Sequence, residues 1–103
     1  MESSEGERVT VKYPFEEAAK MLKVVAHPIR LSIIAFLKGG RKNVTEVQEA
    51  TGCKQSITSQ HLSAMAEKGI LGRDKIANEV FYYIRKKEVL KLLSCIKGCC
   101  DSK

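Results

Sequence analysis

The sequence predicts a mainly α-helical domain with one small β-hairpin close to its C-terminal end. Apolar residues recur at helical spacing in several segments, whereas residues 70–84 contain two short runs typical of strands. With 103 residues, of which 44% are hydrophobic, the chain has room for one domain with a modest core. We expect that domain at residues 13–97, after a disordered tail at 1–12 and before a cysteine-containing tail at 98–103.

The first two predicted helices begin at prolines. Pro14 suits the first turn of a helix, and an apolar stripe follows it as far as Val25. Pro28 begins a second helix that is apolar on most sides, which is typical of a segment at the centre of a core. The glycine pair at 39–40 ends this helix. We interpret His27 as the residue that caps the second helix, and not as a ligand.

Residues 43–71 predict a short helix, a turn at Gly52 and a second helix. Asn43 and Glu46 have the spacing of a capping box at the start of the short helix. After the turn, four apolar positions fall near one face: Ile57, Leu62, Met65 and Ala66. The opposite face carries short neutral side chains that suit base edges and phosphates in a major groove: Gln55, Ser56, Thr58, Ser59, Gln60 and His61. Because a merely solvated face would contain more Glu, Lys and Arg, this pattern favours a DNA-binding helix-turn-helix.

A β-hairpin and a last helix follow. Strands are predicted at residues 70–76 and 80–84, joined by residues 77–79 with Asn78 in the turn. A hairpin directly after a recognition helix is the added element of a winged helix-turn-helix. The last helix is predicted from Lys87 to about Lys97. The apolar faces of the first and last helices are larger than a core of this size needs, so we expect them to form the interface of a homodimer.

Charge and composition narrow the class of function. The net charge of +6 and the pI of about 9.3 favour a polyanionic partner. There is neither a long apolar span nor a signal-peptide core, so we expect a cytoplasmic protein that does not enter membranes. A CxxC pair, a phosphate loop and paired carboxylates are also lacking, so we do not expect an enzyme. The alternative is a winged-helix module that binds another protein, whose affinity would not depend steeply on salt.

Three segments resemble the ArsR/SmtB family of transcriptional repressors. They are AHPIRLSII at Ala26–Ile34, VTEVQEATGCKQSITSQHLSAMAEKGIL at Val44–Leu71, and VFYYI at Val80–Ile84. The combination of HPxR with SxxSQHL is the most specific part of the match. The resemblance implies a homodimer whose first and last helices form the interface. It also implies binding to imperfect palindromes in double-stranded operator DNA, and release of that DNA when an inducer binds.

The resemblance and the helix pattern indicate the same DNA-contacting residues. Base edges would be contacted from the start of the second helix, by Gln55, Ser56, Thr58, Ser59 and Gln60, with His61 donating to a phosphate. Lys54 stands where the family commonly has a Ser or Thr cap, a replacement that costs about 1 kcal/mol and that a phosphate contact by Lys54 would partly offset. In the hairpin, Arg73, Lys75 and Asn78 would enter the flanking minor groove. The alternative is that Ser and Thr satisfy local backbone groups while His61 packs beside the core.

The cysteines suggest what the inducer is. Cys95, Cys99 and Cys100 cluster near the C-terminus, which in a cytoplasmic chain indicates thiol chemistry or metal ligation. Three thiolates suit trigonal As(III) or Sb(III), and some members of the family use a C-terminal cysteine trio in this way. We therefore expect no required cofactor and a trivalent metalloid as inducer, with Zn(II) or Cd(II) less favoured.

Other interpretations of the cysteines stay open. The family's CxC site would need cysteines at Asn43 and Thr45, and its zinc site on the last helix lacks its histidines here. Oxidation or persulfidation of the cluster is the main rival to metalloid binding, and an incidental cysteine-rich tail is the simplest alternative. Cys53, at the helix-turn-helix turn, is interpreted as a small buried hydrophobic residue.

Overall fold

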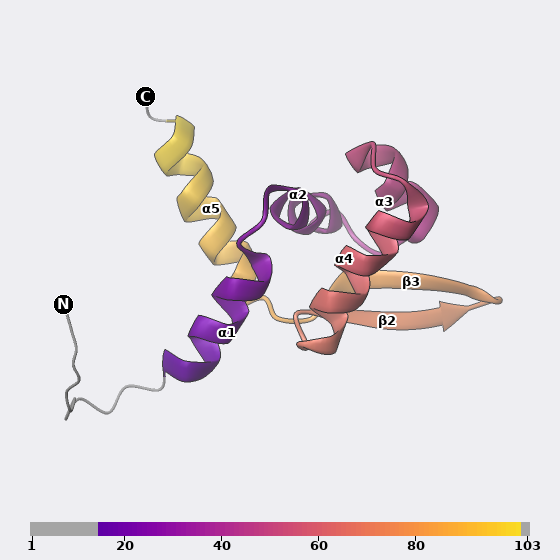
Figure 1. Ribbon diagram of the computed structural model, residues 1–103, viewed down its shortest axis with the longest axis horizontal. Coiled ribbons are helices and arrows are strands. Elements are labelled where there is room, and N and C mark those ends of the chain that lie inside the picture. Colours follow the sequence, from indigo (N-terminus) through magenta and orange to yellow (C-terminus); the bar gives the residue numbers. More distant parts are fainter. Residues whose placement is uncertain (1–14, 102–103) are drawn as a thin grey trace.

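The computed structural model describes residues 15–101, with side chains described as far as Ile96 (Figure 1). The elements of this part are α1 (Phe15–Val25), α2 (Pro28–Leu37), β1 (Lys42–Asn43), α3 (Val44–Thr51), α4 (Gln55–Glu67), β2 (Leu71–Ile76), β3 (Glu79–Ile84) and α5 (Glu88–Asp101). This order confirms the predicted mainly α-helical fold with a small hairpin. The tail expected at 1–12 and the helix start at Pro14 lie outside the described residues.

Capping bonds at α2 and α3 confirm the predicted helix starts. His27 precedes α2, and its Nδ1 accepts a hydrogen bond from the Ile29 backbone N–H at 3.1 Å. At α3, Asn43 Oδ1 accepts from the Glu46 N–H at 2.8 Å, and Glu46 Oε1 accepts from the Asn43 N–H at 2.9 Å. This reciprocal pair is the predicted capping box. Gly52 ends α3 with a φ of 77°, a left-handed conformation that costs glycine little.

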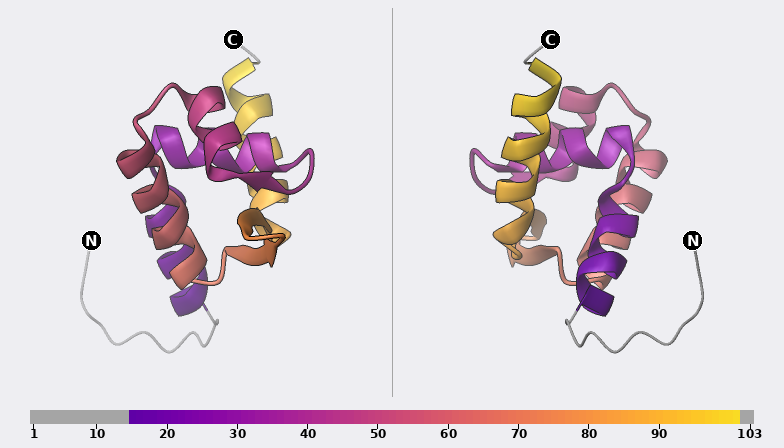
Figure 2. Two further views of the ribbon diagram at one scale, coloured as in Figure 1. Left: turned by 90° about the vertical axis from the view of Figure 1, so that its right-hand side faces the viewer. Right: turned by 90° about the vertical axis from the view of Figure 1, so that its left-hand side faces the viewer.

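The hairpin belongs to a three-stranded antiparallel sheet in the order β1-β3-β2. The sequence pattern does not predict β1, because two residues are too few to show alternation. Lys42 and Asn43 of β1 pair with Tyr82 and Phe81 of β3. Since Asn43 also caps α3, this short strand joins the helix-turn-helix to the middle of β3. The tip of the hairpin projects away from the helices in Figure 1, and Figure 2 views the molecule along the hairpin.

The turn of the hairpin is shorter than predicted. The sequence predicts residues 77–79 as the connection between the strands, but Glu79 pairs with Ile76 in the strand ladder. Only Ala77 and Asn78 form the turn, with φ angles of 51° and 68°. A two-residue turn in which both residues are left-handed matches the twist of the strands that it joins. Asn78 thus has the turn position that the sequence predicts, at the tip of the hairpin.

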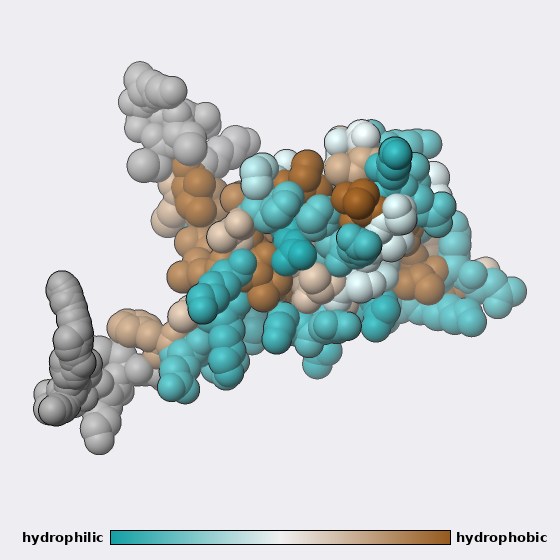
Figure 3. All heavy atoms as spheres, in the orientation of Figure 1, coloured by the Kyte–Doolittle hydropathy of each residue, from teal (hydrophilic) through white to brown (hydrophobic). Residues whose placement is uncertain are grey.

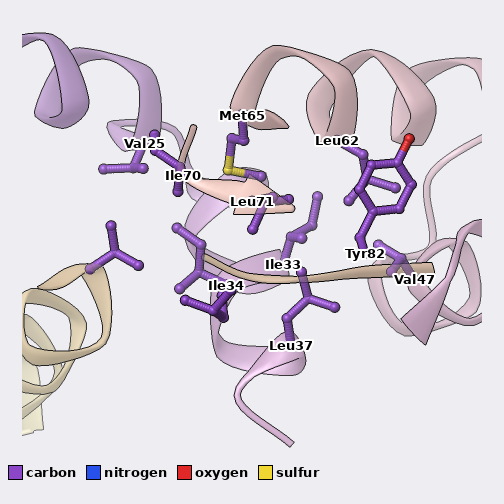
Figure 4. Close-up of a cluster of buried hydrophobic side chains, with 12 residues drawn as sticks. Val25, Ile33, Ile34, Leu37, Val47, Leu62, Met65, Ile70, Leu71 and Tyr82 are labelled. Atoms are coloured by element: carbon purple, nitrogen blue, oxygen red, sulfur yellow. The ribbon is translucent and has the colours of Figure 1, made fainter. Parts of the chain in front are cut away.

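The core receives side chains from every element except β1 (Figure 4). The helix α2 supplies Ile33, Ile34 and Leu37, which explains why its sequence is apolar on most sides. Facing α2 are Leu62 and Met65 of α4, both fully buried. Burying a side chain of this size contributes about 1.5–3 kcal/mol. The recognition helix is therefore anchored to the centre of the molecule by its apolar face.

The helices α1 and α5 diverge at the end of the molecule opposite the tip of the hairpin (Figure 1). Phe15 and Leu22 of α1 are 65% and 44% exposed, and Ile96 of α5 is 38% exposed. Figure 3 shows hydrophobic surface gathered along α5 and next to α1. These unburied apolar side chains agree with the prediction that the two helices have more apolar surface than the core of one chain can cover.

The last helix is longer than predicted. The helix α5 has 14 residues and runs to Asp101, beyond the predicted end near Lys97.

None of the helices within residues 15–101 has both the length and the apolar character that a bilayer crossing requires.

Candidate DNA interface

The first half of α4 presents an exposed polar surface. Lys54, Gln55, Ser56 and Gln60 are exposed and Ser59 is half-buried; we call these five residues the recognition face. Lys54 occupies the N-cap position, and its side chain makes no capping bond. The backbone N–H groups of the first turn therefore keep their partial positive charge, which suits phosphate oxygens.

The prediction that Thr58 contacts DNA is wrong. Its side chain is fully buried, and its hydroxyl donates to the Lys54 carbonyl oxygen at 2.9 Å. The alternative interpretation of Ser and Thr near a helix start predicts this kind of bond to a nearby backbone group. Thr58 therefore stabilises the first turn of α4 from inside and does not belong to the recognition face.

The prediction that Ile57 belongs to the apolar face of α4 is also wrong, because its side chain is 40% exposed. Ile57 follows Ser56 in the chain and lies one turn before Gln60 and His61, so it adjoins the recognition face. Its methyl groups are suited to contact with the methyl group of thymine. The exposed surface of α4 thus adds one apolar side chain to its hydrogen-bonding groups.

His61 is half-buried and is held by residues that precede the helix-turn-helix. Its Nδ1 accepts a hydrogen bond from Arg30 Nε of α2 at 3.0 Å, and its ring lies 4.7 Å from the ring of His27 between centroids. Arg30 Nη1 also donates to the Val24 carbonyl oxygen of α1 at 2.9 Å. The Nδ1 side of His61 therefore packs inside the protein, as the packing interpretation predicts. The contact of His61 with a DNA phosphate stays a prediction.

The surroundings of His61 favour the neutral ring. Burial, then the positive charge of Arg30, then His27 lower the pKa of His61 below its ordinary value of 6.5. A neutral imidazole has one acceptor nitrogen and one N–H group, and a guanidinium can only donate. Because Arg30 donates to Nδ1, the proton of the neutral ring is on Nε2.

The wing of the predicted fold is the hairpin β2–β3, and its three predicted DNA contacts, Arg73, Lys75 and Asn78, are all exposed. Asp74 lies between the two cations in sequence, but it is bonded to Arg41. The Asp74 Oδ2 atom accepts from Arg41 Nε at 2.8 Å and also contacts Arg41 Nη2. With the charge of Asp74 balanced by Arg41, Arg73 and Lys75 give β2 a positive character.

Further contacts hold the wing at both ends of its strands. Arg41 stacks over the ring of Tyr83, with its Cζ atom 4.7 Å from the ring centroid. Tyr83 also packs closely against Gly72, its partner in the strand ladder, where an added Cβ would come within 2.2 Å of the tyrosine ring. Asn43 Nδ2 donates to Glu79 at 2.9 Å. These contacts hold the wing in one orientation relative to the helix-turn-helix.

Two residues that organise the interface were missed by the sequence-based prediction. Arg30 lies within the HPxR segment, so a signal was present, but its bond to His61 spans 31 residues of sequence. Arg41 gives no signal at all, because a single cation between two helices resembles any solvated loop residue. The bond of Arg30 to His61 and the bond of Arg41 to Asp74 both depend on the tertiary fold.

The structure describes only part of the predicted cysteine site. Cys95 is exposed on α5, whereas the side chains of Cys99 and Cys100 lie outside the described residues. Among the side chains that are described, no group of three or more His, Cys, Asp or Glu is arranged to hold a metal ion. Cys53 is half-buried, so its interpretation as a buried hydrophobic residue is only partly correct.

Comparison with known proteins identifies the family. The profile described as "Bacterial regulatory protein, arsR family" matches residues 27–72, from the cap of α2 to the start of β2. The HTH-type transcriptional regulator YgaV of Escherichia coli (strain K12) is 34% identical over 84 residues, which are 81% of this chain and 85% of YgaV. The transcriptional repressor PagR of Bacillus anthracis is 38% identical over 86 residues, covering 80% of this chain and 86% of PagR.

Solved structures support the same assignment. The crystal structure of PagR matches with a TM-score of 0.72 at 34% identity, covering 80% of this chain and 94% of that one. A homodimeric winged helix-turn-helix DNA-binding domain from Mycobacterium bovis matches with a TM-score of 0.74, covering 84% of this chain and 81% of that one. Its 24% identity supports the fold alone, and the predicted winged helix-turn-helix is confirmed. The chain belongs to the ArsR family of bacterial transcriptional regulators.

Proposed function

We propose that this chain is a cytoplasmic repressor that binds operator DNA as a homodimer. The recognition face enters the major groove, and Arg73, Lys75 and Asn78 of the wing lie along the adjacent minor groove. The observation that carries this proposal is the polar, acid-free recognition face, on a helix that its buried apolar side chains hold in place. Because no side chain caps the start of α4, the N–H groups of its first turn attract phosphate more strongly.

The homodimer is proposed from the exposed apolar side chains of α1 and α5. One short helix offers few phosphate contacts, whereas two recognition helices about 34 Å apart would reach successive major grooves on one side of a duplex. Pairing through Phe15, Leu22 and Ile96 removes apolar surface from water at the end of the molecule away from the wing.

Fluorescence anisotropy with a duplex from the chain's own promoter tests DNA binding. For about six to ten phosphate contacts, the affinity falls about 10³- to 10⁵-fold between 50 and 200 mM salt. A random-sequence duplex of equal length should bind more weakly at each salt concentration. Equal, weak and salt-independent binding to both duplexes would contradict the proposal and favour a module that binds proteins.

We also propose that Cys95, Cys99 and Cys100 bind a thiophilic inducer, with As(III) or Sb(III) as its most suitable form. In a regular helix, position 99 is about 40° from position 95 around the axis, whereas position 100 is about 140° away. Since α5 is helical through Asp101, three-sulfur ligation requires the turn after Gly98 to unwind. Unwinding the end of α5 would disturb the proposed dimer interface and weaken operator binding by about 5- to 150-fold.

The inducer is tested by titrating operator-bound protein with arsenite, antimonite, Cd(II), Zn(II) and a persulfide donor. Release by arsenite or antimonite, lost when the three cysteines are replaced by serine, supports the metalloid site. Cys53→Ser is the matched control and should respond as the unmodified chain does. Release by the persulfide donor alone assigns the same cysteines to redox sensing instead. A triple-serine variant that responds normally to every inducer contradicts any sensing role for the cluster.

A further inference from the structure

Arg30 of α2 bonds both the recognition helix α4 and the first helix α1. Its Nε donates to His61 Nδ1 of α4 at 3.0 Å, and its Nη1 donates to the carbonyl oxygen of Val24, close to the end of α1, at 2.9 Å. The guanidinium is planar, so its donors are fixed relative to one another. The two bonds together therefore define both the place and the rotation of the His61 ring.

The bond from Arg30 also selects the tautomer of His61. With Nδ1 engaged as an acceptor, the neutral ring carries its proton on Nε2. Among the described residues, Nε2 has no hydrogen-bond acceptor, and the ring is half-exposed. In the free protein, solvent is the acceptor available to this donor. Any partner that covers His61 together with the recognition face must supply an acceptor for this N–H group or lose affinity.

The place of His61 on α4 indicates what that acceptor is. His61 lies about 140° around the helix axis from Ser56, so it occupies the edge of the exposed surface and not its centre. When a helix lies in a major groove, its central side chains face base edges and its flanking side chains face the phosphates. The neighbouring cation Arg30 adds favourable charge for an anionic acceptor.

We propose that Arg30 is a positioning residue for DNA binding, which holds His61 in the tautomer whose Nε2–H donates a hydrogen bond to a DNA phosphate. This inference rests on the proposed operator-binding function. It gives the HPxR segment of α2 a role in DNA affinity, although Arg30 itself lies behind the recognition helix, bonded to the side of His61 that carries Nδ1. The contact is independent of base sequence, so its loss should weaken operator and random DNA alike.

The tautomer is tested first, without DNA. Long-range ¹H–¹⁵N NMR of the full chain, labelled at histidine and assigned with His61→Asn, should show an unprotonated Nδ1 and a protonated Nε2 at neutral pH. In Arg30→Met the ring should become a mixture of tautomers. A protonated Nδ1 in the unmodified chain, or an unchanged signal in Arg30→Met, overturns the proposal. This measurement remains decisive even if the chain binds no DNA, which would be a failure of the proposed function alone.

The DNA contact is tested by a double-mutant cycle on the promoter duplex and on a random duplex. Arg30→Met and His61→Ala should each weaken both affinities about tenfold, the loss of one hydrogen bond at each of two half-sites. The double variant should be no weaker than either single variant, because both remove one contact. His61→Gln, which keeps an N–H donor, should recover part of the affinity. Losses that multiply in the double variant overturn the proposal.

Two further variants separate positioning from charge and from folding. Lys23→Met removes an exposed cation from α1 and should change affinity only slightly. Arg30→Lys keeps the charge but not the planar donors, so it should weaken binding nearly as much as Arg30→Met. It also serves if Arg30→Met does not fold, as judged by circular dichroism. An Arg30→Lys variant with the affinity of the unmodified chain shows that charge alone matters and overturns the proposal.

Discussion

The two ends of this molecule expose surfaces of opposite character. At the end formed by α4 and the wing, the exposed groups are mostly polar, and several are held by partners: Asp74 by Arg41, Glu79 by Asn43, and His61 by Arg30. At the end formed by α1 and α5, Phe15, Leu22 and Ile96 are exposed apolar side chains.

This difference teaches how one small domain can serve two kinds of partner. Polar side chains are satisfied by water in the free protein, so an interface made of them can remain open until DNA arrives. Apolar side chains at water cost free energy for as long as they are exposed, and a contiguous patch of them requires a stable cover. We therefore expect reversible binding at the first end and a lasting subunit interface at the second.

The largest predicted effect comes from placing charge in the apolar end. Replacing Leu22 and Ile96 together by Glu should yield a monomer, because two carboxylates would have to be buried in each half of the interface. Loss of the second recognition helix should weaken operator binding by about 10²- to 10⁴-fold. Sedimentation velocity and anisotropy measure the two effects.

A matched control for this variant lies at the other end of the molecule. Ile76 is also an exposed apolar side chain, but it belongs to the wing. Ile76→Glu should leave the dimer intact and weaken DNA binding only through its added negative charge. A dimer that survives the double substitution in α1 and α5, or dissociates in Ile76→Glu, would show that the two ends have been assigned the wrong partners.

The next effect concerns base reading by the recognition face. Gln60→Ala should weaken operator binding by roughly 1–3 kcal/mol for each lost base contact and leave binding to random DNA nearly unchanged. The stability of the fold should not change, since the side chain is exposed. Competition between operator and random duplexes measures this loss of specificity.

Thr58 gives the control on the same helix. Thr58→Val removes the hydroxyl that donates to Lys54, so it should lower stability by about 1 kcal/mol while the operator preference remains. If Thr58→Val instead reduces specificity as strongly as Gln60→Ala does, then the buried position of Thr58 does not describe the DNA-bound protein.

The error over Thr58 shows which part of the interface the sequence could predict. The helix order and the caps at His27 and Asn43 depend on neighbouring residues, so local patterns suffice for them. Thr58 was assigned by its chemistry, although it stands four and seven residues before Leu62 and Met65 and so shares their buried face. Helical spacing, applied to every residue of α4, predicts this position correctly.

Other features were beyond any local pattern. The bond between Arg30 and His61 and the contact of Arg41 with Asp74 join segments that are more than 30 residues apart in sequence. The strand β1 has two residues and exists only because β3 offers it a partner. Such features are consequences of the packed fold, which explains why the sequence predicts the exposed surface of the site better than the contacts that hold it.

A smaller effect is expected for stability against pH. The pKa of His61 is lowered in the folded protein, so below 6.5 the unfolded chain binds more protons at this residue than the folded chain does. Stability should therefore fall as the pH decreases through 6.5, whereas well above that value the ring is neutral in both states and contributes no slope. Urea unfolding between neutral and mildly acidic pH measures this, with His61→Gln as the reference. Identical pH slopes for the two proteins would contradict the lowered pKa of the half-buried His61.

The smallest predicted effect is found at the tip of the wing. Ala77 has a φ of 51°, a conformation that costs a residue with a Cβ roughly 1–2 kcal/mol. Ala77→Gly should relieve this strain and, after the added entropy of the unfolded chain, raise stability by about 0.5–1 kcal/mol. The same substitution at exposed Ala35 in α2 should lower stability by about 1 kcal/mol, because a helix interior favours alanine. Urea unfolding of both variants gives the comparison. Opposite signs for one chemical change would identify backbone conformation as the cause, whereas a loss at both positions would mean that the turn is not left-handed at residue 77.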